Sequence, residues 1–66
     1  MQNSIKVQRA IHSMTQAELA EKIGVSRQTI NAMESNKYVP STVLALKIAR
    51  LFNVKVEDIF TLEETD

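Results

Sequence analysis

Apolar residues recur every three or four positions along most of this sequence, which is the spacing of helices that bury one face. The pattern is clearest over residues 15–34. Leu19, Ala20 and Ile23 repeat at helical spacing, so they form one apolar face. Gly24 follows, and glycine readily adopts the left-handed conformation that ends a helix. The first half of this stretch therefore predicts a short amphipathic helix with a defined end.

Capping residues fix where the helices of this stretch begin. Thr15 is a favourable N-cap, and Glu18 three residues later completes the capping-box pattern. Ser26 is a second N-cap, and Ile30 and Met33 place one apolar stripe on the segment after it. The sequence therefore predicts two short helices joined by one tight turn.

The second of these helices carries a polar outer face. Arg27, Gln28, Asn31 and Ala32 project away from its apolar stripe, and none of them is a large apolar side chain. Two helices that cross at a small residue such as Ala20, with glycine in the turn, form the helix-turn-helix that places its second helix in the DNA major groove. This geometry makes DNA the first candidate ligand.

Three further helices are expected. One spans about Ile5 to Ser13, a second about Thr42 to Phe52, and a short last one Val56 to Phe60. The second of these has the longest apolar face, which consists of Leu44, Ala45, Ile48, Ala49 and Phe52.

The chain resembles the lambda/434 repressor and Cro-type helix-turn-helix family, which includes small xenobiotic-response-element-like regulators. The resemblance is carried by TQAELAEKIGVSRQTINAMESNK followed by ALKIARLFNV, and it extends over about residues 5–60. It implies an all-α, five-helix DNA-binding domain spanning residues 1–66, with the helix-turn-helix at 16–34 and a dimerisation end at about 43–62. It also implies a small antiparallel sheet, in which the N-terminus pairs with Thr61 to Glu63.

DNA contacts divide into those that read bases and those that position the protein on phosphates. A recognition helix enters the groove by its N-terminal end, so base reading is expected from Arg27, Gln28, Asn31 and Ala32. Arginine pairs with guanine, glutamine and asparagine with adenine, and a methyl group with thymine. The resemblance implies phosphate contacts from a second set: Gln16, Ser26, Asn36, Lys37 and Tyr38.

The resemblance also implies a structural ion pair between Arg9 and Glu34. A bidentate contact between guanidinium and carboxylate would tie the second helix of the motif to the first helix of the chain. The chain departs from the family pattern at three positions. Gln8 replaces an apolar residue, and Ser13 and Asn36 stand where glycine is common.

Composition adds a charge asymmetry. The net charge is zero, but residues 1–55 contain all eight Lys and Arg and only three of the eight acidic residues. Residues 56–66 contain the other five acidic residues and no basic one, so the charges are +5 and −5. A basic patch, rather than net charge, is what meets phosphates.

Other chemistries lack residues to support them. There is no Cys and one His, His12, so neither a disulfide nor a metal site is expected. No nucleophile–base pair points to catalysis, and no cofactor is implied. No apolar run approaches the ~20 residues of a membrane span, and the N-terminus lacks a signal-peptide core. We therefore expect a cytoplasmic protein that is not an enzyme.

A homodimer is expected on two grounds. A chain of 66 residues buries only about 60% of its unfolded surface, so association would stabilise it. Leu46, Val56 and Phe60 are apolar but predicted to lie off the core face, where relatives make a twofold contact. The alternative for Phe60 is that it covers the protein's own core.

The sequence therefore favours a transcription regulator, most simply a homodimeric repressor that reads a palindromic operator in double-stranded DNA. The alternative is a protein-interaction module of the same fold, such as an antitoxin or anti-repressor. A protein binder should present apolar anchors on the helix after Ser26, and an antitoxin commonly adds a toxin-wrapping segment. Neither feature is expected here.

Overall fold

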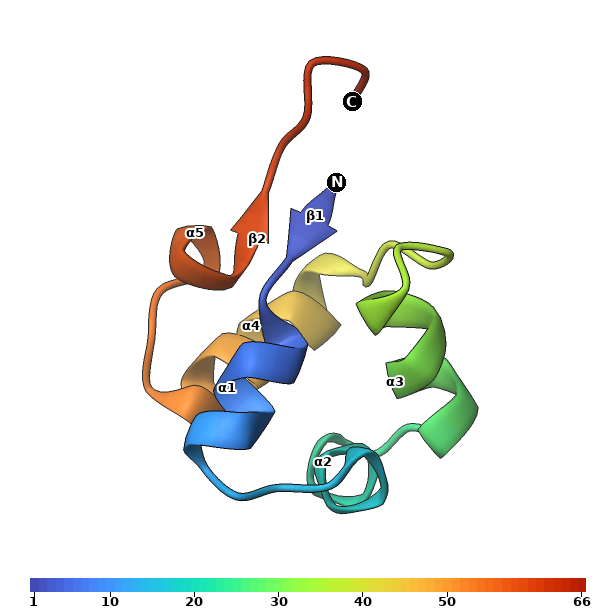
Figure 1. The fold of residues 1–66 in the computed structure, drawn as a ribbon, viewed down its shortest axis with the longest axis vertical. Coiled ribbons are helices and arrows are strands. Elements are labelled where there is room, and N and C mark those ends of the chain that lie inside the picture. The colour runs from blue at the N-terminus through green and yellow to red at the C-terminus, as the bar shows by residue number, and fades with distance from the viewer.

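A computed structural model describes all 66 residues as five helices and a two-stranded sheet (Figure 1). The elements in chain order are β1 (Gln2–Asn3), α1 (Ile5–Ile11), α2 (Gln16–Ile23), α3 (Arg27–Glu34), α4 (Thr42–Phe52), α5 (Val56–Ile59) and β2 (Phe60–Thr61). The predicted all-α, five-helix architecture with a small terminal sheet is confirmed. No helix of the chain has the length and apolar character needed to span a bilayer.

The helix boundaries follow the capping signals. The Thr15 hydroxyl accepts a hydrogen bond from the Glu18 amide at 3.0 Å, and the Thr15 amide donates to the Glu18 carboxylate at 3.1 Å. Ser26 and Ser41 accept from backbone amides in the same way at the starts of α3 and α4. Gly24 ends α2 in the left-handed conformation, with φ of 76°. The α2–α3 turn is therefore fixed by local sequence.

Two asparagines end helices in the left-handed region. Asn36 has φ of 62° and Asn53 has φ of 57°, and asparagine tolerates this conformation better than most residues. Ser13 also has positive φ, at 52°, and α1 ends earlier than predicted, at Ile11. The left-handed Ser13 lies where the chain turns from α1 into α2.

One core joins the five helices and β2. Its six fully buried side chains come from all five helices: Ile5, Leu19, Ile30, Met33, Ile48 and Ile59. Burial of each such side chain contributes about 1.5–3 kcal/mol. The predicted face of α4 is confirmed, since Leu44, Ile48, Ala49 and Phe52 are buried and Ala45 is half-buried. This core fixes the position of α3.

The terminal sheet pairs β1 and β2 antiparallel, with Gln2 opposite Thr61 and Asn3 opposite Phe60. The N-terminus pairs with the C-terminal segment as predicted, but the C-terminal strand is Phe60–Thr61, so Leu62 and Glu63 of the predicted Thr61 to Glu63 lie outside it. The prediction that Phe60 is the last residue of a helix is wrong, because α5 ends at Ile59 and Phe60 is extended, with φ of −108°. The chain extends as soon as it leaves the single turn of α5.

Asn3 connects this sheet to the end of α3. Its Nδ2 donates to the Met33 carbonyl at 2.7 Å and to the Asn36 Oδ1 at 3.1 Å. Its Oδ1 accepts from the Ile5 amide at 3.2 Å, at the start of α1. One side chain therefore joins the N-terminal strand, α1 and the turn after α3.

Candidate nucleic-acid interface

The outer face of α3 presents the polar side chains that the sequence placed there. Arg27, Gln28 and Asn31 are all exposed, and Ala32 is half-buried. With Gln16 at the start of α2, the first three line a hollow of about 320 Å³ that contains no hydrophobic residue. The structure therefore brings together three predicted base-reading side chains and leaves them uncovered.

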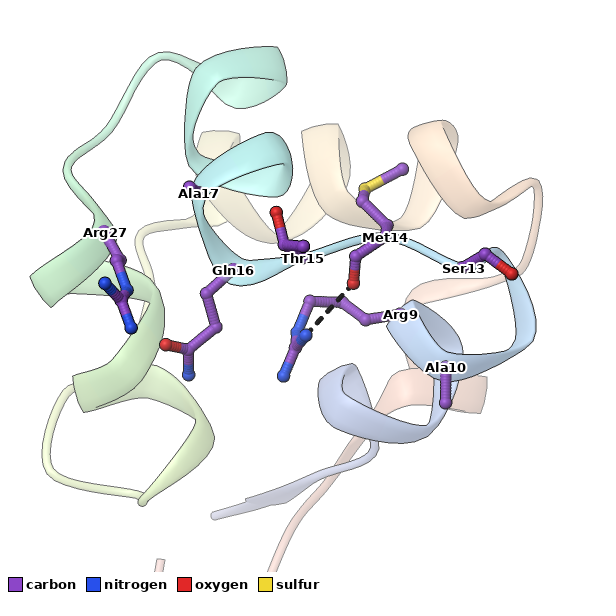
Figure 2. A pocket seen from close by; sticks show the side chains of 8 residues that line it. All are labelled: Arg9, Ala10, Ser13, Met14, Thr15, Gln16, Ala17 and Arg27. Atoms are coloured by element: carbon purple, nitrogen blue, oxygen red, sulfur yellow. Dashed lines mark hydrogen bonds between the residues drawn. The ribbon is translucent and has the colours of Figure 1, made fainter.

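A second hollow lies where α2 begins, between α1 and α3 (Figure 2). It has a volume of about 640 Å³, and Arg27 and Gln16 project toward it from α3 and α2. The backbone amides of Gln16 and Ala17 have no acceptor within the chain, as is usual in the first turn of a helix. A helix N-terminus beside an arginine is suited to an anion such as a DNA phosphate.

The ion pair lies at the C-terminal end of α3, next to Gln16. The Arg9 Nε and Nη2 donate to the two carboxylate oxygens of Glu34 at 2.6 and 3.0 Å, so the contact is bidentate. The side chains are only 14% and 8% exposed. The Arg9 Nη1 also donates to the Met14 carbonyl at 3.0 Å, as the dashed line in Figure 2 shows. One guanidinium thus joins α1, the α1–α2 loop and the end of α3.

Glu34 receives a third hydrogen bond, from Gln16. The Gln16 Nε2 donates to Glu34 Oε1 at 3.0 Å and lies 3.4 Å from Asn31 Oδ1. Burial by itself would raise the pKa of Glu34, but the hydrogen bonds from Arg9 and Gln16 outweigh it and hold that pKa below its ordinary value of 4.5. The carboxylate is therefore ionised at neutral pH.

The residues expected to contact phosphate differ in their exposure and in whether their side chains already make hydrogen bonds. Lys37 and Tyr38 are exposed in the loop after α3. The Ser26 hydroxyl is engaged at the start of α3, where it accepts from the Thr29 amide at 3.1 Å and lies 2.9 Å from the Thr29 hydroxyl. The Asn36 side chain is exposed, and its Oδ1 accepts from Asn3.

Two of the three residues expected at a dimer interface line one groove, and the third is buried in the core. Leu46 is 54% exposed and Val56 is half-buried, and both line a groove of about 790 Å³ along α4 and the α4–α5 connection. Phe60 is only 8% exposed and belongs to the core, so its predicted place off the core face is wrong. Its backbone is already extended where it pairs with Asn3, and this turns the ring inward against the core.

Other predicted positions are simple to place. His12 is exposed just after α1, with its ring 5.0 Å from the ring of Phe52, and Met33 is fully buried. No group of three or more His, Asp or Glu side chains converges.

Val7 and Ile11 of α1, at 57% and 67% exposed, are apolar surface residues that the sequence did not lead us to expect. Residues four apart lie on the same side of a helix, so their spacing could have indicated a shared apolar surface.

The fold is that of a helix-turn-helix domain, the kind of domain that binds double-stranded DNA. The chain belongs to the helix-turn-helix family HTH_3, whose pattern matches residues 5–59.

Its relatives carry the same description. It is 56% identical over 66 residues to an uncharacterized HTH-type transcriptional regulator of Methanocaldococcus jannaschii, with 100% of both chains covered. It is 50% identical over 64 residues to the uncharacterized HTH-type transcriptional regulator YgzD of Bacillus subtilis, with 97% of each covered. The family is thus one of DNA-binding regulators rather than enzymes.

Solved structures give the same fold. The chain superimposes on the crystal structure of a "putative DNA-binding protein" from Bacteroides fragilis with a TM-score of 0.79 and 40% identity, covering 88% of this chain and 94% of that one. It also superimposes on the SOS-response transcriptional repressor LexA from Eubacterium rectale with a TM-score of 0.80 and 27% identity, covering 94% and 66%.

Replacing Arg9 by Ala should lower the free energy of unfolding by about 3–5 kcal/mol, because it leaves the largely buried Glu34 carboxylate unpaired. Urea denaturation followed by circular dichroism at pH 7 measures the change. Arg27→Ala is the matched control, since Arg27 is exposed and makes no hydrogen bond within the chain, and it should change stability little. Equal midpoints for the two variants would contradict a structural role for the pair.

The Glu34 interaction should also depend on pH. Because the folded-state pKa lies below 4.5, its stabilisation is complete above that pH and is lost as pH falls through the folded-state pKa. Other carboxylates, including Glu18, also have lowered pKa values, so wild type must be compared with Glu34→Gln. The difference between their unfolding free energies should shrink between pH 7 and pH 3. A difference that stays constant over this range would rule out the effect.

Proposed function

We propose that this protein is a homodimeric repressor that reads a palindromic operator by placing α3 in the major groove. The observation that carries the proposal is the exposed polar face of α3, whose C-terminal end is joined to α1 by the contact between Arg9 and Glu34. Repression needs no further activity, since a protein bound over a promoter excludes polymerase by occupying its site.

The order of residues on α3 supports base reading at its N-terminal end. Arg27 and Gln28 are the first two residues after the Ser26 cap, and this end enters the groove first in helix-turn-helix proteins. Gln28 is exposed and makes no hydrogen bond within the chain, so both ends of its amide are free for the donor and acceptor of adenine. We assign Gln28 to base reading and Ala32 to a methyl contact further along the helix.

Phosphate contacts would flank α3 on both sides. On one side lie the free amides at the start of α2, at Gln16 and Ala17, with the Arg27 guanidinium near them. On the other side are exposed residues of the following loop, Lys37 and Tyr38, next to the left-handed Asn36. The five acidic residues of positions 56–66 belong to α5 and the C-terminal segment, away from α3 in Figure 1. This distribution would orient α3 toward the DNA.

The groove along α4 supports a twofold contact. Its apolar rim includes Val43 and Leu46, which are 63% and 54% exposed, and the half-buried Val56. Figure 1 shows α5 and the α4–α5 connection on the opposite side of the molecule from α3. A dimer formed there leaves both copies of α3 free, and DNA-binding dimers of this class set them about 34 Å apart, one helical turn.

Selection from a library of random duplexes should return a palindromic consensus, and affinity for it should fall steeply with salt. Gln28→Ala should cost about 1–3 kcal/mol at one base position of each half-site. Lys37→Ala should weaken all sequences alike and reduce the salt slope, because it removes a phosphate contact. Uniform losses across all sequences for both variants would show that Gln28 reads no base.

Leu46→Asp should convert the dimer into a folded monomer, because a carboxylate would be buried without a partner in the twofold contact. Analytical ultracentrifugation measures the mass, and circular dichroism checks the fold. Val7→Asp is the control, since Val7 is similarly exposed, at 57%, but lies on α1. The twofold contact at α4 is wrong if Leu46→Asp sediments as wild type does.

A further inference from the structure

Hydrogen bonds of the backbone close the end of α3. The Asn36 amide donates to the Met33 carbonyl at 3.1 Å, and the Lys37 amide donates to the Ala32 carbonyl at 2.9 Å. With Asn36 left-handed, at φ of 62°, these two bonds form the Schellman arrangement that ends many helices. The backbone of Asn36 is therefore fixed relative to α3, and the rotation of its side chain is what remains to be set.

The carboxamide of Asn3 lies against this turn, and its neighbours determine its orientation. The Met33 carbonyl only accepts hydrogen bonds, so the Asn3 atom that lies 2.7 Å from it must be the donor Nδ2. The Ile5 amide only donates, and it reaches the Asn3 Oδ1 at 3.2 Å. The backbone of Asn3 is also paired with Phe60 in the terminal sheet. Asn3 is therefore held at its backbone and at both ends of its side chain.

The second hydrogen of the Asn3 Nδ2 determines how the side chain of Asn36 is turned. That Nδ2 lies 3.1 Å from the Asn36 Oδ1 and donates to it. If the Asn36 amide were reversed, two NH2 groups would face each other and neither would find an acceptor. The Asn36 Nδ2 therefore points away from Asn3. This NH2 group belongs to an exposed side chain and makes no hydrogen bond within the chain.

We propose that Asn3 is a positioning residue for DNA binding, which holds the Asn36 amide so that its Nδ2 donates to a DNA phosphate. The inference rests on the proposed function, because it assumes that the loop after α3 lies along the DNA backbone. Phosphate oxygens only accept hydrogen bonds, so Nδ2 is the part of the amide that they can use. The Asn36 Oδ1 keeps one lone pair that Asn3 does not use, but a DNA phosphate has no hydrogen to donate to it.

Asn36 and Lys37 would contact the DNA backbone in different ways. A lysine neutralises phosphate charge and releases counterions, so its contribution to affinity falls steeply with salt. The Asn36 amide is neutral and acts through a directed hydrogen bond, so it should not contribute to the salt slope. A side chain that is already held in place loses less conformational entropy on binding. Asn3 would therefore raise the affinity for all sequences without reading any base.

A double-mutant cycle, measured on the selected consensus duplex, tests this inference. Asn36→Gly permits the left-handed backbone but removes the amide, so binding should weaken about tenfold. Asn3→Ala leaves the Asn36 amide free to rotate, so binding should weaken about two- to fivefold. In the double variant, Asn3→Ala should add no further loss, because no amide is left to be held. Neither change should alter the salt slope, whereas Lys37→Ala should reduce it.

Asn53→Gly is the matched control, since Asn53 is also exposed and left-handed, at φ of 57°, but follows α4. This variant should bind DNA as the wild type does. Circular dichroism shows whether each variant is folded under the conditions of the binding assay. A measurement on the wild type needs no variant, because the NMR signals of the Asn36 side-chain NH2 group should shift when the duplex is added.

Failure of the wild type to select any consensus would reject the proposed function itself. If a consensus is found, three results would overturn only this inference. These are unshifted Asn36 NH2 signals, wild-type affinity of Asn36→Gly, and an equal loss from Asn3→Ala with and without Asn36→Gly. The last result would mean that Asn3 acts on binding through the end of α3 at Met33 and not through the Asn36 amide.

Discussion

The contact between Arg9 and Glu34 is the interaction on which the arrangement of this small protein depends. Both side chains are largely removed from solvent, and the guanidinium reaches α1, the α1–α2 loop and the end of α3 at once. A charge pair in this position is not an efficient source of stability, since its desolvation offsets much of its attraction. The pair instead constrains the orientation of α3, because a bidentate contact has one favourable geometry. The angle of α3 is therefore set by polar chemistry, on top of the apolar burial of Ile30 and Met33.

The local parts of this fold were predictable from the sequence because their causes are local. The caps at Thr15 and Ser26, the left-handed Gly24 and the helical spacing in α4 each depend on residues within one or two turns. The polar face of α3 follows from the same spacing once its buried stripe is known. Because these helix boundaries each have their own signal in the sequence, few other divisions of the chain into helices are possible.

Features that depend on distant residues were predicted only through the family resemblance, as for the terminal sheet and the Arg9–Glu34 pair, or not at all. Phe60 follows Val56 at helical spacing, yet it is buried because β2 pairs with a strand nearly sixty residues away. Asn3 shows no sign in the sequence that its side chain bonds the end of α3. The orientation of a side-chain amide is still harder to predict from sequence, because it depends on which neighbouring atoms donate and which accept hydrogen bonds. Such choices require the three-dimensional network.

Because the chain is short and has a small core, binding at one proposed surface should affect binding at the other through the stability of the fold. A chain of 66 residues has little core, so anything that binds only the folded state raises its stability by mass action. Partner binding at α4 and DNA binding at α3 would both do so, and each would therefore favour the other even without a change of shape. Since Glu34 joins α3 to α1 and both pack on the same core as α4, a dimer that stabilised α4 would also hold the exposed side chains of α3 in place. Occupancy of an operator would then rise more steeply than in proportion to protein concentration.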